Sequence, residues 1–204
     1  MTEEKALTKG EQTRAAIIDA AYSLFLRNGF HGTSMRRIAE KADLALGGIY
    51  NHFSSKEEIF AAVLDAYHPY RRILPALEAA NGETIEDFVR DGAERVRAAI
   101  HGSEKHVLPL AFIELVEFQG RHLAQLAQIL LPSMFAFAQR FAERRGKLRN
   151  IPLPVMLRAF IGIFLAFLFT EMVLKNMPLL KNADYDWFGG MVDIYLHGIL
   201  EPEA

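Results

Sequence analysis

Apolar residues recur at helical spacing along most of the 204-residue chain, and this periodicity constrains the fold more than any other feature of the sequence. Residues 13–28 show the pattern clearly, with apolar side chains at positions i, i+3, i+4, i+7 and i+8 of one helical face. These side chains are Ile17, Ala20, Ala21, Leu24 and Phe25. Because we find neither the alternating pattern of a strand nor an internal repeat, the sequence predicts an all-α fold of about nine helices.

Capping residues mark several of the expected helix boundaries. Gly29 suits the C-terminal end of the first helix, and Thr33 suits the N-cap of the second. Ser55 and Glu58 have the spacing of a capping box, which predicts a further helix. Later helices are expected to begin after Thr84, Ser103 and Asp186.

Prolines interrupt the helical pattern at defined points. A long segment over residues 121–145 is expected to break or kink at Pro132. Pro154 suits the start of a helix that continues to about Asn176. An earlier stretch between two expected helices is punctuated by Pro69, Pro75 and Gly82.

The composition excludes several kinds of chemistry. The chain has no cysteine, which excludes disulfide scaffolds, cysteine-ligated zinc or iron–sulfur sites and thiol nucleophiles. The sequence contains no glycine-rich phosphate loop and no HExxH or GxSxG motif. His101 and His106 are five residues apart, so they do not share a helical face as a metal pair. We therefore expect a protein that is not an enzyme and needs no metal or cofactor.

Targeting and membrane signals are weak in this sequence. The first ten residues lack the apolar segment of a secretory signal, which favours a cytoplasmic protein. The most apolar run covers residues 159–170, between Arg158 and Glu171. Twelve residues are too few to cross a bilayer, so we expect a buried or interface helix and no membrane partner.

Residues 33–53 carry the most specific pattern in the chain. Two short helices separated by a tight turn at residues 42–44 have the dimensions of a helix-turn-helix unit. Such a unit cannot bury its apolar face alone. The preceding helix, through Leu24 and Phe25, is therefore expected to complete its core.

The run from Thr13 to Phe60 resembles the DNA-binding domain of tetracycline-repressor-type (TetR family) regulators. Four segments match in order and spacing: RAAIIDAA at 14–21, NGF at 28–30, GIYNHF at 48–53 and SKEE at 55–58. The resemblance implies a helix-turn-helix DNA-binding domain over residues 1–54 and a helical ligand-binding and dimerisation domain over residues 55–204. It also implies a homodimer on a palindromic double-stranded DNA operator, and family habit favours a repressor.

The resemblance also assigns roles to individual residues. Tyr50, His52 and Lys56 match positions at which the family holds DNA phosphates, and Arg36 matches a position that can reach base edges. Hydroxyls at the N-terminus of the preceding helix suit a further phosphate. The full expected DNA-binding set is Thr33, Ser34, Arg36, Ala45, Leu46, Gly47, Gly48, Tyr50, Asn51, His52 and Lys56.

The expected recognition helix departs from the usual family pattern. Asp43 stands where the turn usually has glycine, and aspartate tolerates the left-handed backbone conformation better than most residues. Ala45 and Leu46 replace residues that are often polar, while Gly47 and Gly48 weaken the helix. Two interpretations stay open. Either the backbone approaches DNA closely with Leu46 or Ala45 against a thymine methyl, or the helix is weak and orders only on DNA.

Charge gives no separate sign of nucleic-acid binding. The chain has a net charge of −2, and residues 1–60 hold 8 basic and 8 acidic residues. A strong non-specific binder would carry an excess of positive charge. The sequence therefore predicts modest affinity for each protomer and binding as a dimer to two half-sites.

The C-terminal region is rich in phenylalanine, with 12 of the 15 in the chain after residue 54. Most of these rings are expected in a core, but a ligand pocket between helices would have the same composition. The resemblance implies a small effector there, apolar or aromatic, whose binding shifts the dimer away from its DNA-competent state. The expected ligand-binding residues are His68, Phe112, Glu114, Leu115, Phe118, His122, Phe135, Phe164 and Phe167.

The last two expected helices are apolar on more than one face, so they need cover on both sides. The resemblance implies that they pair with their copies in a partner subunit. The expected interface residues are Leu165, Leu168, Phe169, Met172, Phe188, Met191, Val192 and Tyr195. An ordinary monomer core is the alternative for these side chains. A helical small-molecule carrier or interaction module without regulatory DNA binding is the alternative for the protein.

Overall fold

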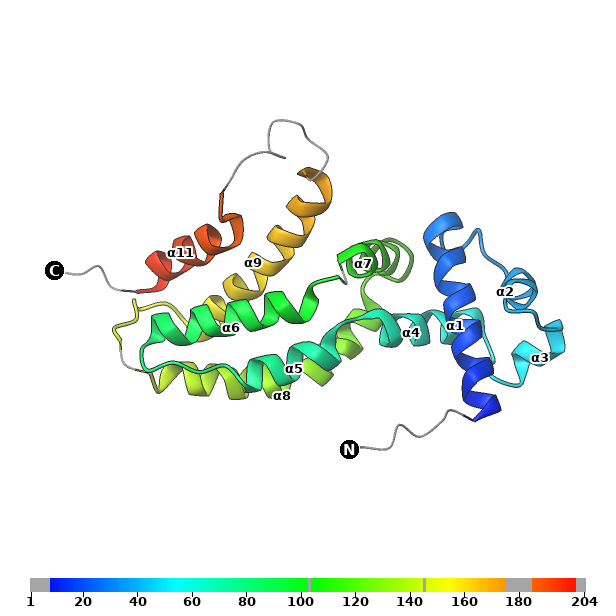
Figure 1. The fold of residues 1–204 in the computed structure, drawn as a ribbon, viewed down its shortest axis with the longest axis horizontal. Coiled ribbons are helices and arrows are strands. Elements are labelled where there is room, and N and C mark those ends of the chain that lie inside the picture. The colour runs from blue at the N-terminus through cyan, green and yellow to red at the C-terminus, as the bar shows by residue number, and fades with distance from the viewer. Residues whose placement is uncertain (1–7, 103, 145, 175–184, 201–204) are drawn as a thin grey trace. The chain divides into compact units, whose positions relative to one another are not determined.

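Helices dominate the described parts of the chain. The computed structural model describes residues 8–102, 104–144, 146–174 and 185–200. In these ranges it contains helices α1 to α9 and α11, and no β-strand (Figure 1). The predicted all-α fold is confirmed.

Two compact units divide the described chain. The first runs to residue 68 and also takes in residues 109–124, and the second contains the remaining described residues. The first unit contains α1 (Lys9–Asn28), α2 (Met35–Lys41), α3 (Leu46–Tyr50) and α4 (Lys56–Tyr67). Within it, α1 packs against both α2 and α4, and α2 packs against α3 (Figure 1).

Aromatic rings form the centre of the core in the first unit. Phe25, Phe30 and Phe60 are buried, and their ring centroids lie between 5.4 and 5.7 Å apart. Phe118 ends α7 (Glu104–Phe118), and its ring lies 4.6 Å from that of Phe30 and 4.8 Å from that of Phe60. The end of α7 therefore shares one core with the N-terminal helices.

The second unit has a separate apolar core. It contains α5 (Tyr70–Glu78), α6 (Ile85–Ile100), most of α8 (Arg121–Ala142), α9 (Leu153–Leu174) and α11 (Trp187–Ile199). Helix α5 packs against α6, and α11 packs against both α6 and α9. The buried ring of Phe160 lies 5.5 Å from Phe137, 5.2 Å from Phe164 and 5.8 Å from Tyr195.

Capping explains where several helices begin, with one correction at α2. Ser34, and not Thr33, is the N-cap of α2, and its hydroxyl accepts the Arg37 backbone N–H at 3.3 Å. The predicted cap at Thr33 is wrong because that hydroxyl donates to the carbonyls of Leu24 and Gly29 instead. The predicted caps of α6 and α11 are confirmed at Thr84 and Asp186, whereas Ser103 lies outside the described residues.

The capping box predicted at the start of α4 forms only in part. The Ser55 hydroxyl accepts the Glu58 backbone N–H at 3.1 Å, as expected. The Glu58 carboxylate, however, accepts the backbone N–H and the hydroxyl of Ser54 at 2.7 and 2.8 Å. These hydrogen bonds, first from the backbone and then from the hydroxyl, lower the pKa of Glu58. In a complete capping box the Glu58 carboxylate would accept the backbone N–H of Ser55, but here it accepts that of Ser54.

Pro75 and Pro132, which we expected to interrupt the helical pattern, lie inside helices. Pro75 lies within α5, a helix in the stretch that we expected prolines to interrupt. Helix α8 continues past Pro132, so the predicted break does not occur there. A kink at Pro132, the alternative, stays a prediction. Helix α9 begins at Leu153, one residue before the predicted proline start. Asn176, its expected end, lies outside the described residues.

Helix α9 is longer than the apolar run that the sequence singled out. Among the described residues it is the helix whose length and composition would allow it to cross a membrane. The argument from too few residues is therefore wrong for the whole helix. Phe160, Phe164 and Leu168 are buried in the core of the second unit, and core helices pass the same test. A membrane span is thus weakly supported.

Helix α4 belongs to the first unit together with the helix-turn-helix. It begins at Lys56, directly after the domain boundary predicted between residues 54 and 55, and it packs on α1. The division into a DNA-binding domain and a ligand-binding domain at this boundary stays a prediction. The compact units show that α4 shares its buried face with the N-terminal helices.

Candidate nucleic-acid interface

The turn between α2 and α3 has the conformation expected of a helix-turn-helix. Asp43 has a φ of 57°, in the left-handed region, and the Leu44 N–H donates to the Ala39 carbonyl at 2.9 Å. The prediction that Asp43 would tolerate this conformation is confirmed. After this turn, Ile49 of α3 is fully buried in the core of the first unit, whereas Leu46 and Tyr50 are exposed.

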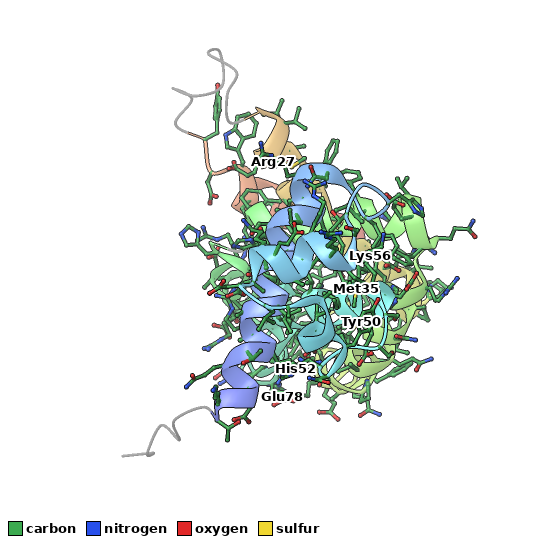
Figure 2. The ribbon with its side chains drawn as sticks, turned by 90° about the vertical axis from the view of Figure 1, so that its right-hand side faces the viewer. Arg27, Met35, Tyr50, His52, Lys56 and Glu78 are labelled. Carbon is green, nitrogen blue, oxygen red and sulfur yellow. The ribbon has the colours of Figure 1, made fainter. Side chains whose placement is uncertain are left out.

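Helix α3 presents a small and apolar surface. The side chains of Leu46 and Tyr50 are 43 % and 53 % exposed, and Figure 2 shows the position of Tyr50. Ala45 is the N-cap and makes no side-chain capping bond, as the sequence indicated. A Cβ added to Gly47 would meet nothing within 4 Å, and one added to Gly48 would lie 3.9 Å from the Leu44 Cβ. Neither glycine is therefore required by packing inside the protomer.

The basic residues of α2 are only loosely engaged. The Arg36 Nε lies 3.0 Å from the Glu40 carboxylate, and both side chains are largely exposed. Exposed pairs of this kind contribute at most about 1 kcal/mol, so the guanidinium can exchange this partner for a base or phosphate. Arg37 donates through Nη1 to the Gly32 carbonyl at 3.0 Å. Ser34 uses its hydroxyl as the α2 cap.

Thr33 and Lys56 are engaged within the protein. Thr33 is 2 % exposed, so its hydroxyl does not face solvent. The Lys56 Nζ donates to the carbonyls of Phe30 and Thr33, both at 2.8 Å, and lies 4.1 Å from the centroid of the Phe30 ring. These contacts fasten the start of α4 to the loop before α2. A phosphate contact by either residue stays a prediction.

The remaining predicted DNA-binding residues follow α3. Asn51 is the exposed C-cap of α3, and His52 is half-buried next to it (Figure 2). The Arg14 guanidinium lies 4.5 Å from the centroid of the Phe53 ring, a contact that sequence reasoning missed. Arg14 lies far from Phe53 in sequence, so no spacing pattern indicates that contact.

Three predicted ligand-binding residues are committed to the core of the first unit. The buried Glu114 carboxylate accepts the His122 backbone N–H at 2.6 Å and lies 2.8 Å from the His122 Nδ1. The His122 ring lies 4.8 Å from that of Phe118, which packs among the rings of α1 and α4. Together these contacts fix the turn between α7 and α8.

The other predicted ligand-binding residues of the first unit have different surroundings. His68 ends α4, and burial lowers its pKa to about 4, so its ring is neutral at pH 7. Phe112 and Leu115 lie on an exposed face of α7. The residues predicted in this unit thus differ in burial and in their contacts, and their ligand contacts stay predictions.

The second unit contains an apolar groove. It has a volume of about 500 Å³ and lies between α8 and α9, with Met134, Phe135, Ile161 and Leu165 in its lining. Arg158 is the charged residue of that lining. Phe135 was predicted as a ligand residue and Leu165 as a dimer residue. The other predicted ligand residues of this unit, Phe164 and Phe167, contact Phe188 at 5.5 and 5.1 Å.

The predicted dimer residues fall into two groups. Leu168, Phe188 and Val192 are buried in the core of the second unit, and Met191 and Tyr195 are half-buried. Three others remain at the surface of α9, namely Leu165, Phe169 and Met172. Only this second group presents apolar surface that a partner could cover.

Comparison with known proteins identifies the N-terminal helices. The family model described as bacterial regulatory proteins, tetR family, matches residues 17–63, which contain the turn at Asp43 and all of α3. These N-terminal helices match the TetR family. The match covers the helix-turn-helix and α4 as far as Val63, where most of the residues quoted for the resemblance lie.

The curated relatives of this chain are named as transcriptional regulators. The chain is 25 % identical over 134 residues to the regulator YvkB of Bacillus subtilis, which covers 65 % of this chain and 69 % of YvkB. It is 42 % identical over 60 residues to TtgR of Pseudomonas putida, but this match spans only 29 % of TtgR. The likeness to TtgR thus concerns a short part of both chains.

A solved structure extends the likeness of fold to nearly the whole chain. NalD of Pseudomonas aeruginosa, the secondary repressor of the MexAB-OprM multidrug efflux pump, superposes with a TM-score of 0.66. The alignment covers 96 % of this chain and 100 % of the NalD chain at 19 % identity. At this identity the likeness concerns the fold alone.

Proposed function

We propose that this TetR-family regulator is a cytoplasmic homodimeric repressor that binds a palindromic operator through α2 and α3. A small apolar or aromatic effector bound to the second unit then releases it from DNA. The observation that carries DNA binding is the exposure of Leu46 and Tyr50 on α3, directly after the left-handed turn at Asp43. The name of NalD as a repressor supports the direction of regulation.

The interface has separate parts for positioning and recognition. Tyr50 is the last residue of α3 and His52 follows it, and we assign to both the contacts with phosphates, which position a protein on DNA without reporting its sequence. To Arg36 on α2 we assign contact with base edges, which requires the guanidinium to leave Glu40. Lys56 stabilises the interface indirectly, because its ammonium holds the loop that leads into α2.

The homodimer rests on the exposed face of α9. Leu165, Phe169 and Met172 recur at spacings of four and three residues, which places them on one face of the helix. Apolar side chains exposed in a row favour burial against another surface. On α11, Gly190 leaves open space beside the backbone, which suits the close approach of a second helix.

The groove between α8 and α9 is the proposed effector site. Its lining is almost entirely apolar, which suits an apolar or aromatic molecule. Leu165 lines the groove and also belongs to the proposed dimer face. An effector in the groove would therefore act on the helix that sets the geometry of the dimer.

DNA binding is tested by fluorescence anisotropy with duplexes from upstream of the gene and scrambled controls, over a range of salt concentrations. We expect tight binding to an upstream duplex, with affinity falling steeply as salt rises. Tyr50→Ala should weaken this binding about tenfold or more, whereas Tyr185→Ala, an exposed tyrosine in the second unit, should not. Absence of binding to any duplex at low salt would favour the carrier alternative.

The effector site is tested separately from DNA binding. Compounds that release the protein from DNA are identified in the same anisotropy assay. Gly162 lines the groove, and a Cβ added there would have nothing within 4 Å, so Gly162→Leu should place a side chain in the groove. We expect this variant to bind DNA as a dimer but to respond much less to the effector. An unchanged response would place the effector elsewhere.

A further inference from the structure

The recognition surface of α3 lacks the side chains that usually select guanine. The segment from Ala45 to Asn51 contains no charged residue. Its exposed side chains are Ala45, Leu46, Tyr50 and Asn51. Arginine and lysine make the commonest specific contacts with guanine, through O6 and N7. This helix therefore has to distinguish base pairs by other means.

Apolar side chains on a recognition helix can contact one apolar group of the bases in the major groove. That group is the 5-methyl of thymine, which no other base of unmodified DNA carries. Leu46 extends from the first turn of α3 with its side chain 43 % exposed, next to exposed Ala45. First-turn residues of a recognition helix are the ones that approach base edges.

Gly47 supports the same conclusion independently. It is exposed directly after Leu46 in the chain, and neither packing nor backbone conformation requires glycine there. Glycine destabilises a helix interior relative to alanine. A glycine without a role in the fold is explained if the helix backbone comes so close to DNA that a Cβ would not fit.

We propose that α3 recognises thymine 5-methyl groups through Leu46 and Ala45, and that Gly47 allows the close approach which this contact needs. The inference rests on the DNA binding proposed above and specifies what the site selects. The operator half-site then contains thymine at one or two positions under the first turn of α3.

The test removes single methyl groups from DNA. Operators are selected from random duplexes with the full-length protein, and each thymine of the selected half-site is replaced in turn by deoxyuridine. We expect affinity to fall about three- to tenfold at one or two thymines. In Leu46→Ala the same replacements should have little effect, because the contacting side chain is missing. Val116→Ala, an exposed apolar residue on α7, should retain the full effect of the replacements.

The outcomes separate this inference from DNA binding itself. If an operator is selected but every deoxyuridine duplex binds as tightly as the thymine duplex, methyl recognition is wrong and DNA binding stands. The same conclusion follows if Leu46→Ala loses as much affinity as the wild type on each replacement. If no sequence is enriched, specific DNA binding fails and the inference fails with it.

Gly47→Ala tests the close approach. We expect its melting temperature to equal or exceed that of the wild type, with affinity for the operator at least tenfold lower. Gly10→Ala is the matched control, because Gly10 also lies in a helix with open space around its Cβ position. That variant should keep the affinity of the wild type. Equal or tighter operator binding by Gly47→Ala would overturn this part of the proposal.

Discussion

The helices around the proposed DNA-binding surface bury their phenylalanine rings, whereas α8 and α9 each leave one exposed. Every phenylalanine from α1 to the start of α4, including Phe53 and Phe60, is buried. In the second unit, Phe135 on α8 and Phe169 on α9 are 61 % and 47 % exposed. The N-terminal helices thus complete their core within one chain, but α8 and α9 do not.

This difference shows that aromatic content alone does not separate a core from an interface. Both regions are rich in phenylalanine, and helical spacing explains only which residues share a face. An exposed row of apolar side chains implies a further covering surface, such as a partner helix or a ligand. Replacing a buried ring and an exposed ring by the same residue tests this difference, because the two substitutions should have unequal effects on stability.

The largest expected effect is the loss of a buried ring in the first unit. Phe60 is fully buried, with ring contacts to Phe25, Phe30 and Phe118. Phe60→Ala should lower the free energy of unfolding by about 3–5 kcal/mol, as measured by urea denaturation monitored by circular dichroism. Phe169→Ala, the control in α9, should cost under about 1.5 kcal/mol in the monomer. Similar losses in the two variants would contradict the contrast between the regions.

A charge on the exposed face of α9 should separate the subunits. Phe169→Glu should weaken dimerisation about a hundredfold, because the carboxylate would have to lose its water at the interface. Sedimentation equilibrium measures the change in the dimer dissociation constant. Val116→Glu is the matched control, since Val116 is a 79 % exposed apolar residue of α7 in the first unit. Equal effects in both variants would mean that the face of α9 is not the interface.

The sequence was sufficient to predict where most helices lie and where several begin. Regular apolar spacing and hydroxyl or carboxylate caps act over three or four residues, so they are visible in the chain itself. Helix α5 was not predicted, because Pro75 lies inside it and its packing against α6 outweighs the missing backbone donor. The N-cap of α2 is Ser34 instead of the predicted Thr33, again because contacts outside the local sequence decide the outcome. Thr33 is buried and bonded to α1.

The helix-turn-helix pattern predicted the residues of the candidate site. The role of each residue, however, also depends on contacts with residues distant in sequence. The turn at Asp43 and the exposed Tyr50 follow from the order of residues in the helix-turn-helix. Lys56 instead bonds the carbonyls of Phe30 and Thr33, which lie 26 and 23 residues away. No local spacing indicates that such a contact forms.

Removing the ammonium of Lys56 tests this structural duty. Lys56→Met leaves two part-buried carbonyls without their charged donor, so we expect the free energy of unfolding to fall by about 1–3 kcal/mol. Lys41→Met is the control at an exposed lysine of α2, and its stability should be unchanged. If Lys56 served only as a phosphate contact, the variant would keep its stability and lose about one unit of the salt dependence of DNA binding.

The smallest expected effect concerns the contact between α1 and the end of α4. The Tyr67 hydroxyl donates to the Asp19 carboxylate at 2.9 Å, and its ring stacks on that of Tyr22 with centroids 3.9 Å apart. Tyr67→Phe removes the hydrogen bond and keeps the ring. We expect it to lower the free energy of unfolding by about 0.5–1.5 kcal/mol at pH 7, as measured by urea denaturation. Tyr50→Phe, on the exposed surface of α3, should leave stability unchanged.

Alkaline titration gives Tyr67 a second and independent signature. Burial, and then the bond to Asp19, raise the pKa of Tyr67 from its ordinary value of 10.0 to about 12. The unfolded chain therefore releases this proton first as pH rises. The contribution of Tyr67 to stability is complete below pH 10 and is lost as pH rises from 10 to about 12. Because Tyr67→Phe has no proton to release, the stability difference between wild type and variant should shrink over this range. A constant difference would show that the hydroxyl is not held in its neutral form by the fold.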